Sequence, residues 1–373
     1  MKSNFDFLQT EFPVLSTFGC QAEKYCFSDP NSCLMKLGMI GESIVNLMFT
    51  YDRIQLPYDN TAVTRIDTLQ REGLLTRDLT DILHALRKAR NKAVHENYDS
   101  ESECKILLQM AYSLCEWFMQ TYGDWNYQHH DFIMPELENK RVSVTQEEKA
   151  AEERQAEELT KQAEQKASTA EAISKSERQK QAGKMASQRP KSEAETRYII
   201  DEQLRQVGWE ADTENLRYSK GTRPAKGHNM AIAEWPTNSS VGQSGRVFVV
   251  TKLIGVIEAK AIHKDIPSVI DYQGKEYPRN IRKEDSEYQI GEWGEYKVPF
   301  TFATNGRPYL KQLETKSGIW FLDLRSPANN PTALHGWISP MGMVELLEKN
   351  PQEGNSALKA LPYDFLTDPN GLN

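Results

Sequence analysis

The 373-residue sequence lacks several hallmarks of membrane, secreted and zinc-binding proteins. No apolar run approaches the roughly 18 residues of a membrane-spanning helix, so we expect no membrane span. The first residues, MKSNFDFLQTEF, are acidic and lack the apolar core of a signal peptide, which predicts a cytoplasmic protein. No CxxC pair is present, so we expect reduced thiols in a helical domain rather than a zinc site. The five cysteines all lie in the first third of the chain: Cys20, Cys26, Cys33, Cys104 and Cys115.

An excess of positive charge is also missing. Lys and Arg number 45 against 53 Asp and Glu, which gives a formal net charge of −8. This balance argues against a polycation that coats nucleic acid without specificity, but it leaves room for a local basic groove. The phosphate-binding pattern GxxxxGK[ST] is absent, so we do not expect this chain to bind ATP.

Composition divides the chain into three parts. Residues 1–135 carry apolar side chains at helical spacing and are expected to form an α-helical bundle, with helices near 34–48, 79–94 and 105–119. Residues 136–191 are rich in Ala, Glu, Gln and Lys and poor in large apolar side chains. This composition predicts a polar helical linker that is exposed to solvent between two domains and carries no functional residues.

The third part, residues 192–345, predicts an α/β domain. A helix over 195–207 with Gly208 after its end is followed by apolar, strand-like runs. These runs lie at 230–235, 246–250, 253–260, 300–304 and 318–323. Residues 346–373 form a C-terminal tail. The fold class we expect is therefore α+β and multidomain, with an all-α part preceding an α/β part.

The sharpest local signal is the pair Glu258 and Lys260 at the end of an apolar strand. Residues two apart on a strand project from the same face, so the carboxylate and the amine are expected side by side. Metal-dependent nucleases use such a pair, in which the carboxylate holds a divalent cation and the lysine helps to activate water. A plain ion pair at a strand end would have the same pattern.

The motifs around this pair resemble a known nuclease family. The segment ETRYIIDEQLRQVGW, which starts at Glu195, is followed by LRYSKGTRP, AIAEWPT and finally EAK, which ends at Lys260. In this order they are similar to the nuclease domain of type I restriction enzyme R subunits (HsdR), of the PD-(D/E)xK superfamily, over residues 192–345. That family also has a Gln-x-x-x-Tyr motif after the lysine, which Gln273 and Tyr277 match.

The resemblance implies Mg²⁺-dependent cleavage of duplex DNA. Glu258 would be a metal ligand, Lys260 the catalytic lysine, and Gln273 and Tyr277 further members of the catalytic site. The helix that carries Glu195 would face Glu258 and supply an accessory metal-binding carboxylate.

One residue of the family pattern is missing. The family has a second metal-binding Asp about fourteen residues before the Glu, usually in Ala-Asp-Tyr, and here that position is Ser244 in ungapped register. No Asp or Glu occurs between Trp235 and Ile257, as if Ala-Asp-Tyr were deleted after Arg246. One carboxylate should hold Mg²⁺ poorly unless Glu234 swings in, so we expect an intact fold with impaired or absent cleavage.

A basic stretch precedes the strands and predicts contact with DNA phosphates. An ordinary solvated loop would have the same composition. The residues concerned are Arg217, Lys220, Arg223 and Lys226, with Tyr218 and Trp235 nearby in the sequence.

The first part carries a second signature. The run from Arg90 to His95 resembles the R-N-x-x-x-H pattern of HEPN-type helical domains, some of which are RNases. In an RNase, Arg90 would clamp a phosphate and His95 would act as general acid or base. A bundle that has kept the signature for structural reasons is the simpler interpretation.

Taken together, the sequence predicts the endonuclease module of a type I restriction-modification R subunit with impaired cleavage. The expected partners are duplex DNA and the methyltransferase and specificity subunits. The tail at 346–373 would lead toward an ATP-driven motor that this chain does not contain. The alternatives are a non-catalytic DNA-binding or assembly module and, third, a HEPN-type RNase.

Overall fold

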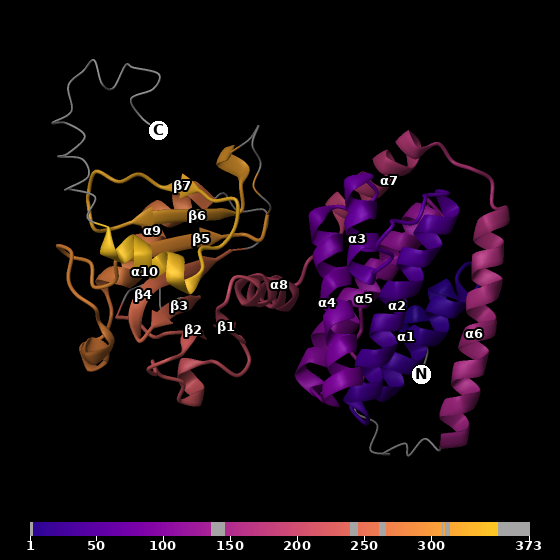
Figure 1. The fold of residues 1–373 in the computed structure, drawn as a ribbon, viewed down its shortest axis with the longest axis horizontal. Coiled ribbons are helices and arrows are strands. Elements are labelled where there is room, and N and C mark those ends of the chain that lie inside the picture. The colour runs from indigo at the N-terminus through magenta and orange to yellow at the C-terminus, as the bar shows by residue number, and fades with distance from the viewer. Residues whose placement is uncertain are drawn as a thin grey trace. The chain divides into compact units, whose positions relative to one another are not determined.

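The computed structural model describes residues 3–135, 146–238, 245–260, 266–307, 309 and 314–349. It divides into two compact units, which we call the helical unit, residues 1–195, and the sheet unit, residues 196–373. Helices fill the first unit and a seven-stranded sheet organises the second (Figure 1). The chain is therefore α+β, as the sequence predicts.

The helical unit places each predicted helix within a longer one, and most of its core side chains are fully buried. Two residues define where α2 begins. Pro30 is its first residue, and the Asp29 carboxylate before it accepts a hydrogen bond from the Ser32 N–H at 3.1 Å. The helices are α1 (Pro13–Tyr25), α2 (Pro30–Tyr51), α3 (Ala62–Arg71), α4 (Arg77–Glu96), α5 (Glu101–Tyr122), α6 (Gln146–Thr169) and α7 (Lys175–Gln188).

Helix α2 is long and apolar enough to cross a membrane by length and composition. The sequence-based exclusion of any such segment was therefore too strong. However, 67% of its most apolar 18-residue window is buried inside the fold, as in the core helix of a soluble protein. The five cysteines of the unit are all free thiols, in agreement with the sequence.

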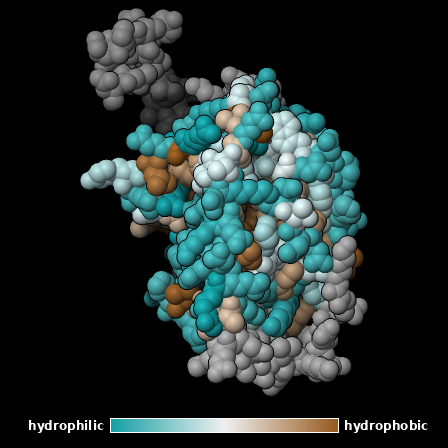
Figure 2. Space-filling model, turned by 90° about the vertical axis from the view of Figure 1, so that its right-hand side faces the viewer, coloured by the Kyte–Doolittle hydropathy of each residue, from teal (hydrophilic) through white to brown (hydrophobic). Residues whose placement is uncertain are grey.

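The polar helices α6 and α7 differ from the expected solvated linker, because they pack on the helical unit. Helix α6 lies along α1 and α2 (Figure 1) and buries small side chains at Ala156, Ala163 and Ala167. Alanine lets helices approach closely without large apolar residues, which composition alone does not reveal. The outer face of this side is largely hydrophilic (Figure 2).

Helix α7 is held against α5 by buried polar contacts. The Arg178 side chain, 3% exposed, donates to Asp52 at 3.3 Å, and its guanidinium lies 4.3 Å from the centre of the Tyr122 ring. The indole N–H of Trp117 donates to the Ala182 carbonyl at 3.1 Å. One side of α7 therefore belongs to the helical unit's core, through Arg178, Ala182, Met185 and Ala186.

The sheet unit contains one mixed sheet whose strands follow their order in the sequence. The pairs β1–β2 and β4–β5 are parallel, and the other neighbours are antiparallel. Its strands are β1 (Glu210–Ala211), β2 (Asn229–Ala233), β3 (Arg246–Val250), β4 (Lys252–Ala259), β5 (Phe300–Thr304), β6 (Ile319–Asp323) and β7 (Thr332–Ala333). Its helices are α8 (Glu193–Gln206), which starts in the helical unit, α9 (Ile266–Arg279) and α10 (Pro340–Glu348).

Apolar clusters cover both faces of this sheet. On one face, α8 and α10 pack against Phe248 and Ile257. On the other, Tyr277 of α9 packs with Val256 and Val247. Because side chains alternate along a strand, Glu258 lies on the face of Val256 and therefore on the side of α9.

Candidate functional site

The predicted acid–amine pair lies at the end of β4, the fourth of the seven strands. Lys260 forms an ion pair with the Glu258 carboxylate, and the Glu258 side chain is only 8% exposed against 27% for Lys260. The Lys260 backbone N–H donates to the Thr304 carbonyl at 2.8 Å, which fixes the chain just after the strand. The two side chains are therefore side by side, and the lysine offsets the cost of burying the carboxylate.

Helix α9 supplies the other two predicted residues. The Tyr277 hydroxyl hydrogen-bonds to Glu258, and burial together with that carboxylate raises the pKa of Tyr277. Gln273 lies one turn earlier on the same face of α9. Its side-chain carbonyl oxygen is buried and has no hydrogen-bond partner among the described residues, so an acceptor is left open.

The residue across the sheet from Glu258 is Gly245. Arg246 pairs with Ile257 in the β3–β4 ladder, so the next antiparallel pair is Gly245 with Glu258. A Cβ atom at Gly245 would lie 3.7 Å from the Glu258 Cα and only 2.8 Å from the Ile257 carbonyl oxygen. The described residues from Gly245 to the end of β3 therefore present no carboxylate to Glu258. Ser244, the ungapped position of the family Asp, lies outside the described residues.

A buried ion pair lies on the opposite face of the sheet. Arg246 is 2% exposed and donates to the Asp201 carboxylate of α8 at 2.8 and 3.0 Å. The same guanidinium donates to the Thr213 hydroxyl at 2.6 Å, while Asp201 also accepts from the Thr213 N–H at 2.7 Å. This cluster anchors β3 to α8, and the sequence analysis did not identify it.

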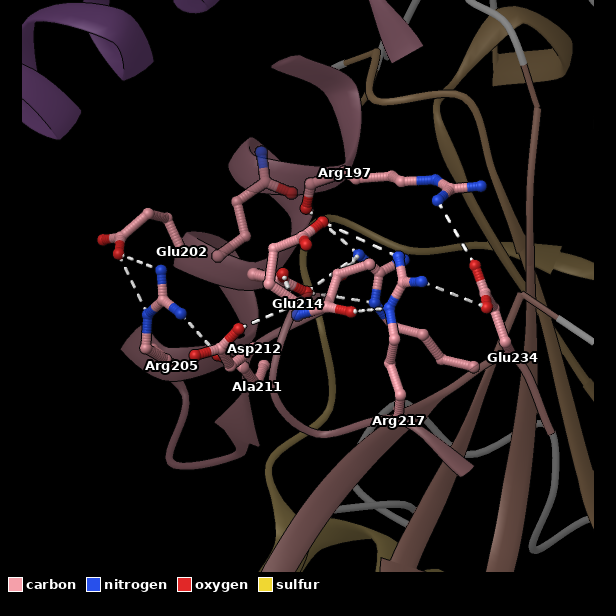
Figure 3. A network of polar contacts seen from close by, with 12 residues as sticks. Arg197, Glu202, Arg205, Ala211, Asp212, Glu214, Arg217 and Glu234 are labelled. Atoms are coloured by element: carbon pink, nitrogen blue, oxygen red, sulfur yellow. Dashed lines mark hydrogen bonds and ion pairs between the residues drawn. The ribbon is translucent and has the colours of Figure 1, made fainter. Parts of the chain in front are cut away.

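Glu234, the carboxylate that could have completed a metal site, is held by two arginines (Figure 3). Its oxygens lie 3.6 Å from Arg197 and 3.3 Å from Arg217. Its backbone adopts φ 55°, a left-handed conformation that costs a non-glycine residue about 1 kcal/mol or more. Two ion pairs and a constrained backbone oppose a swing toward Glu258.

The predicted DNA-binding residues divide into two groups. Arg217 donates to the Thr213 carbonyl at 2.6 Å besides its contact with Glu234, and Arg223 stacks 3.4 Å from the centre of the Tyr218 ring. Both guanidinium groups therefore serve local structure. Lys220 and Lys226 are exposed on the same loop. Contact of any of the four with DNA stays a prediction.

Glu195 lies in the first turn of α8 and belongs to the helical unit. The expectation that its helix faces Glu258 was wrong, because α8 packs on the other face of the sheet. Both Glu195 oxygens accept from Arg189, at 2.5 and 3.0 Å, in a buried ion pair of the helical unit. The role of Glu195 as an accessory metal ligand stays a prediction.

In the helical unit, Arg90 and His95 both lie on α4. Arg90 forms an ion pair with Glu42 of α2, whereas His95 is exposed near the end of α4. The RNase role suggested by the sequence stays a prediction.

The described residues around Glu258 offer few ligands to a metal ion. Among the described residues, no group of three or more His, Cys, Asp or Glu side chains is arranged to hold a metal ion. Glu258 offers one carboxylate, which already binds Lys260 and Tyr277. Mg²⁺ in proteins is usually held by one or two carboxylates with water and phosphate, and Glu258 is one such carboxylate.

Comparisons with known proteins cover both units. Residues 210–347 match the family model of the type I restriction enzyme EcoKI endonuclease subunit second domain. Residues 20–161 match a domain of unknown function, DUF4145, and this match continues into α6.

One curated relative spans nearly the whole chain. It is the type I restriction enzyme EcoKI endonuclease subunit of Escherichia coli (strain K12), 28% identical over 432 residues. The match covers 95% of this chain but only 37% of that relative's length. No solved structure matches. The resemblance predicted from the motifs is thereby confirmed: the chain is similar, over nearly its whole length, to a region of a type I restriction enzyme R subunit.

Proposed function

We propose that the sheet unit is the PD-(D/E)xK-type nuclease module of a restriction R subunit, and that it cleaves DNA poorly or not at all. The observation that carries this proposal is the environment of Glu258. Its contacts with Lys260 and Tyr277 support a nuclease-type site, whereas Gly245 opposite it supports weak cleavage. The restriction role itself rests on the similarity described above.

In this proposal each residue has a defined chemical role. When bound, a divalent metal would neutralise charge that develops on the scissile phosphate. Glu258 would be the one carboxylate ligand, Lys260 would position the attacking water, and Tyr277 and Gln273 would orient Glu258 and Lys260. Losing one ligand can cost several kcal/mol of transition-state stabilisation, or about 10³-fold in rate at ~1.4 kcal/mol per decade.

The module would then serve the restriction complex mainly by binding DNA or by assembly. Duplex DNA, the methyltransferase subunit and the specificity subunit are its proposed partners, in the cytoplasm. The exposed Lys220 and Lys226 are available to meet phosphates without any metal.

The test is a plasmid-nicking assay with Mg²⁺ on the full chain, on Glu258→Ala and on two insertion variants. Ala-Asp-Tyr placed after Arg246 continues the ladder so that Tyr faces Ile257 and the new Asp faces Glu258. The matched control inserts Ala-Asn-Tyr, which has the same length without the acid. Both insertions displace Arg246 from Asp201, so this structural cost is common to the two variants.

We expect no measurable cleavage by the unmodified chain, and tighter Mg²⁺ binding by the Asp insertion than by the Asn insertion in calorimetric titration. Both variants must show the far-ultraviolet spectrum of the parent. Robust cleavage by the unmodified chain that disappears in Glu258→Ala would show that another acid completes the site. Equal metal binding by the two insertions would show that the missing Asp is not what limits it.

A further inference from the structure

A cavity of about 370 Å³ lies within the helical unit, between α2, the start of α3 and α4. These helices are visible together in Figure 1. The volume is at the lower end of the range for small-molecule sites. Nothing in the proposed nuclease function uses this cavity.

The charged residues of its wall are three arginines and a single glutamate: Arg65, Arg87, Arg90 and Glu42. Their formal charges sum to about +2. A net positive, partly desolvated cavity favours an anion, because opposite charges interact more strongly where water is excluded.

Two of the arginines are held in place by other side chains. Arg65 donates to Asn46 at 2.5 Å and to Asn60 at 2.6 Å, and Arg90 pairs with Glu42. A guanidinium fixed in this way loses little conformational freedom when it binds a ligand.

Arg87 differs from its neighbours. Its Nε–H is buried and has no hydrogen-bond partner among the described residues. A buried donor without an acceptor costs free energy, which an anionic ligand in the cavity would recover. On the same helix, burial lowers the pKa of His84 and the charge of Arg87 adds to that effect, whereas Asp67 opposes it.

The rest of the wall suits a ligand with an organic part. Val45, Ile66 and Leu83 give an apolar side, and the first residues of α3 lie at the positive end of a ten-residue helix. We propose that this cavity binds a small phosphate ester, with the phosphate between Arg87 and Arg65 and the organic group on the apolar side. Arginine suits phosphate because its planar fork can donate two parallel hydrogen bonds.

The test is thermal unfolding and calorimetric titration of the full chain with ribose 5-phosphate, AMP, pyrophosphate, inorganic phosphate and adenosine. The phosphate esters should bind saturably and raise the unfolding temperature, whereas adenosine should not. If inorganic phosphate binds as tightly as the esters, the cavity is a simple anion site and the organic part of the proposal is wrong. If no phosphate compound binds at millimolar concentration, the proposal is wrong altogether.

Variants locate the site. Arg87→Gln and Arg65→Gln should each weaken binding by about 10-fold or more, as expected when a charge-assisted hydrogen bond is lost. Arg77→Gln is the matched control, since this exposed arginine of α4 pairs with Asp81 at the surface, 3.2 Å away. His95→Gln should also leave binding unchanged, which separates this cavity from an RNase-like site. Unchanged affinity in both Arg87→Gln and Arg65→Gln, with folding intact, would overturn the assignment.

Discussion

Replacing Asp201 by alanine should destabilise the sheet unit more than any ordinary surface change. The substitution removes the carboxylate that accepts two hydrogen bonds from Arg246, at 2.8 and 3.0 Å. The guanidinium is 2% exposed and would keep only the Thr213 hydroxyl and the Arg197 carbonyl as acceptors. Breaking one side of a buried ion pair typically costs about 3–5 kcal/mol.

For a unit of this size, 1 kcal/mol lowers the unfolding temperature by about 2–4 °C, so Asp201→Ala should lower it by about 6–20 °C. Calorimetry gives the temperature, and hydrogen exchange of peptides from β3 and β4 assigns the loss to the sheet unit. The control is Asp271→Ala, because that carboxylate is 58% exposed and pairs with Lys275 at the surface. It should cost at most about 0.5 kcal/mol.

A double variant separates the buried charge from simple packing. Arg246→Met combined with Asp201→Leu removes both charges, so it should recover much of the stability lost in Asp201→Ala. A loss below about 1 kcal/mol in Asp201→Ala would refute the reasoning, since the pair would then not be structurally important. A double variant as unstable as the single one would show that shape, and not the uncompensated charge, is responsible.

Two further predictions concern the helical unit. In thermal unfolding, Gly38→Ala should destabilise it by about 1–3 kcal/mol, because the new Cβ would lie 2.3 Å from the Arg90 Cβ. Gly41→Ala is the control and should be tolerated, because its new Cβ would lie 3.5 Å from the nearest atom. Burial acts to raise the pKa of Asp78, but Lys191 and other positive neighbours outweigh it and hold this pKa below its ordinary value. The stability that the ionised Asp78 contributes is present above about pH 4 and is lost as the pH falls further. Asp78→Asn should therefore reduce the slope of the unfolding free energy against pH in this acid range. An unchanged slope would contradict this.

The strands that the sequence predicted best are those with short, apolar, β-branched or aromatic runs. The predicted and observed bounds agree for β3, Arg246–Val250, and for β5, Phe300–Thr304. In both cases the apolar pattern in the sequence stops where the strand ends. The acid and amine of Glu258 and Lys260 were predicted on one face by the two-residue period alone, and the structure places them together.

Other features depend on contacts that no local pattern contains. Arg246 looks like an exposed strand end in the sequence, because its partner Asp201 is 45 residues away. The residue opposite Glu258 can be identified as Gly245 only from the register of the β3–β4 pair, which the sequence does not specify. The alanines of α6 contribute a contact surface although they add little to hydrophobicity, so composition alone made that helix look solvated.

The packing of α7 also decides where the chain can be divided for separate study of its parts. Arg178 covers Asp52, and the Ala182 carbonyl is the acceptor for the Trp117 indole. A fragment that ended after α5 would leave this buried carboxylate without its cation and expose an aromatic surface to water. A helical fragment for separate study should therefore include α7 and extend to Glu195, although a composition-based division would have cut at about residue 135.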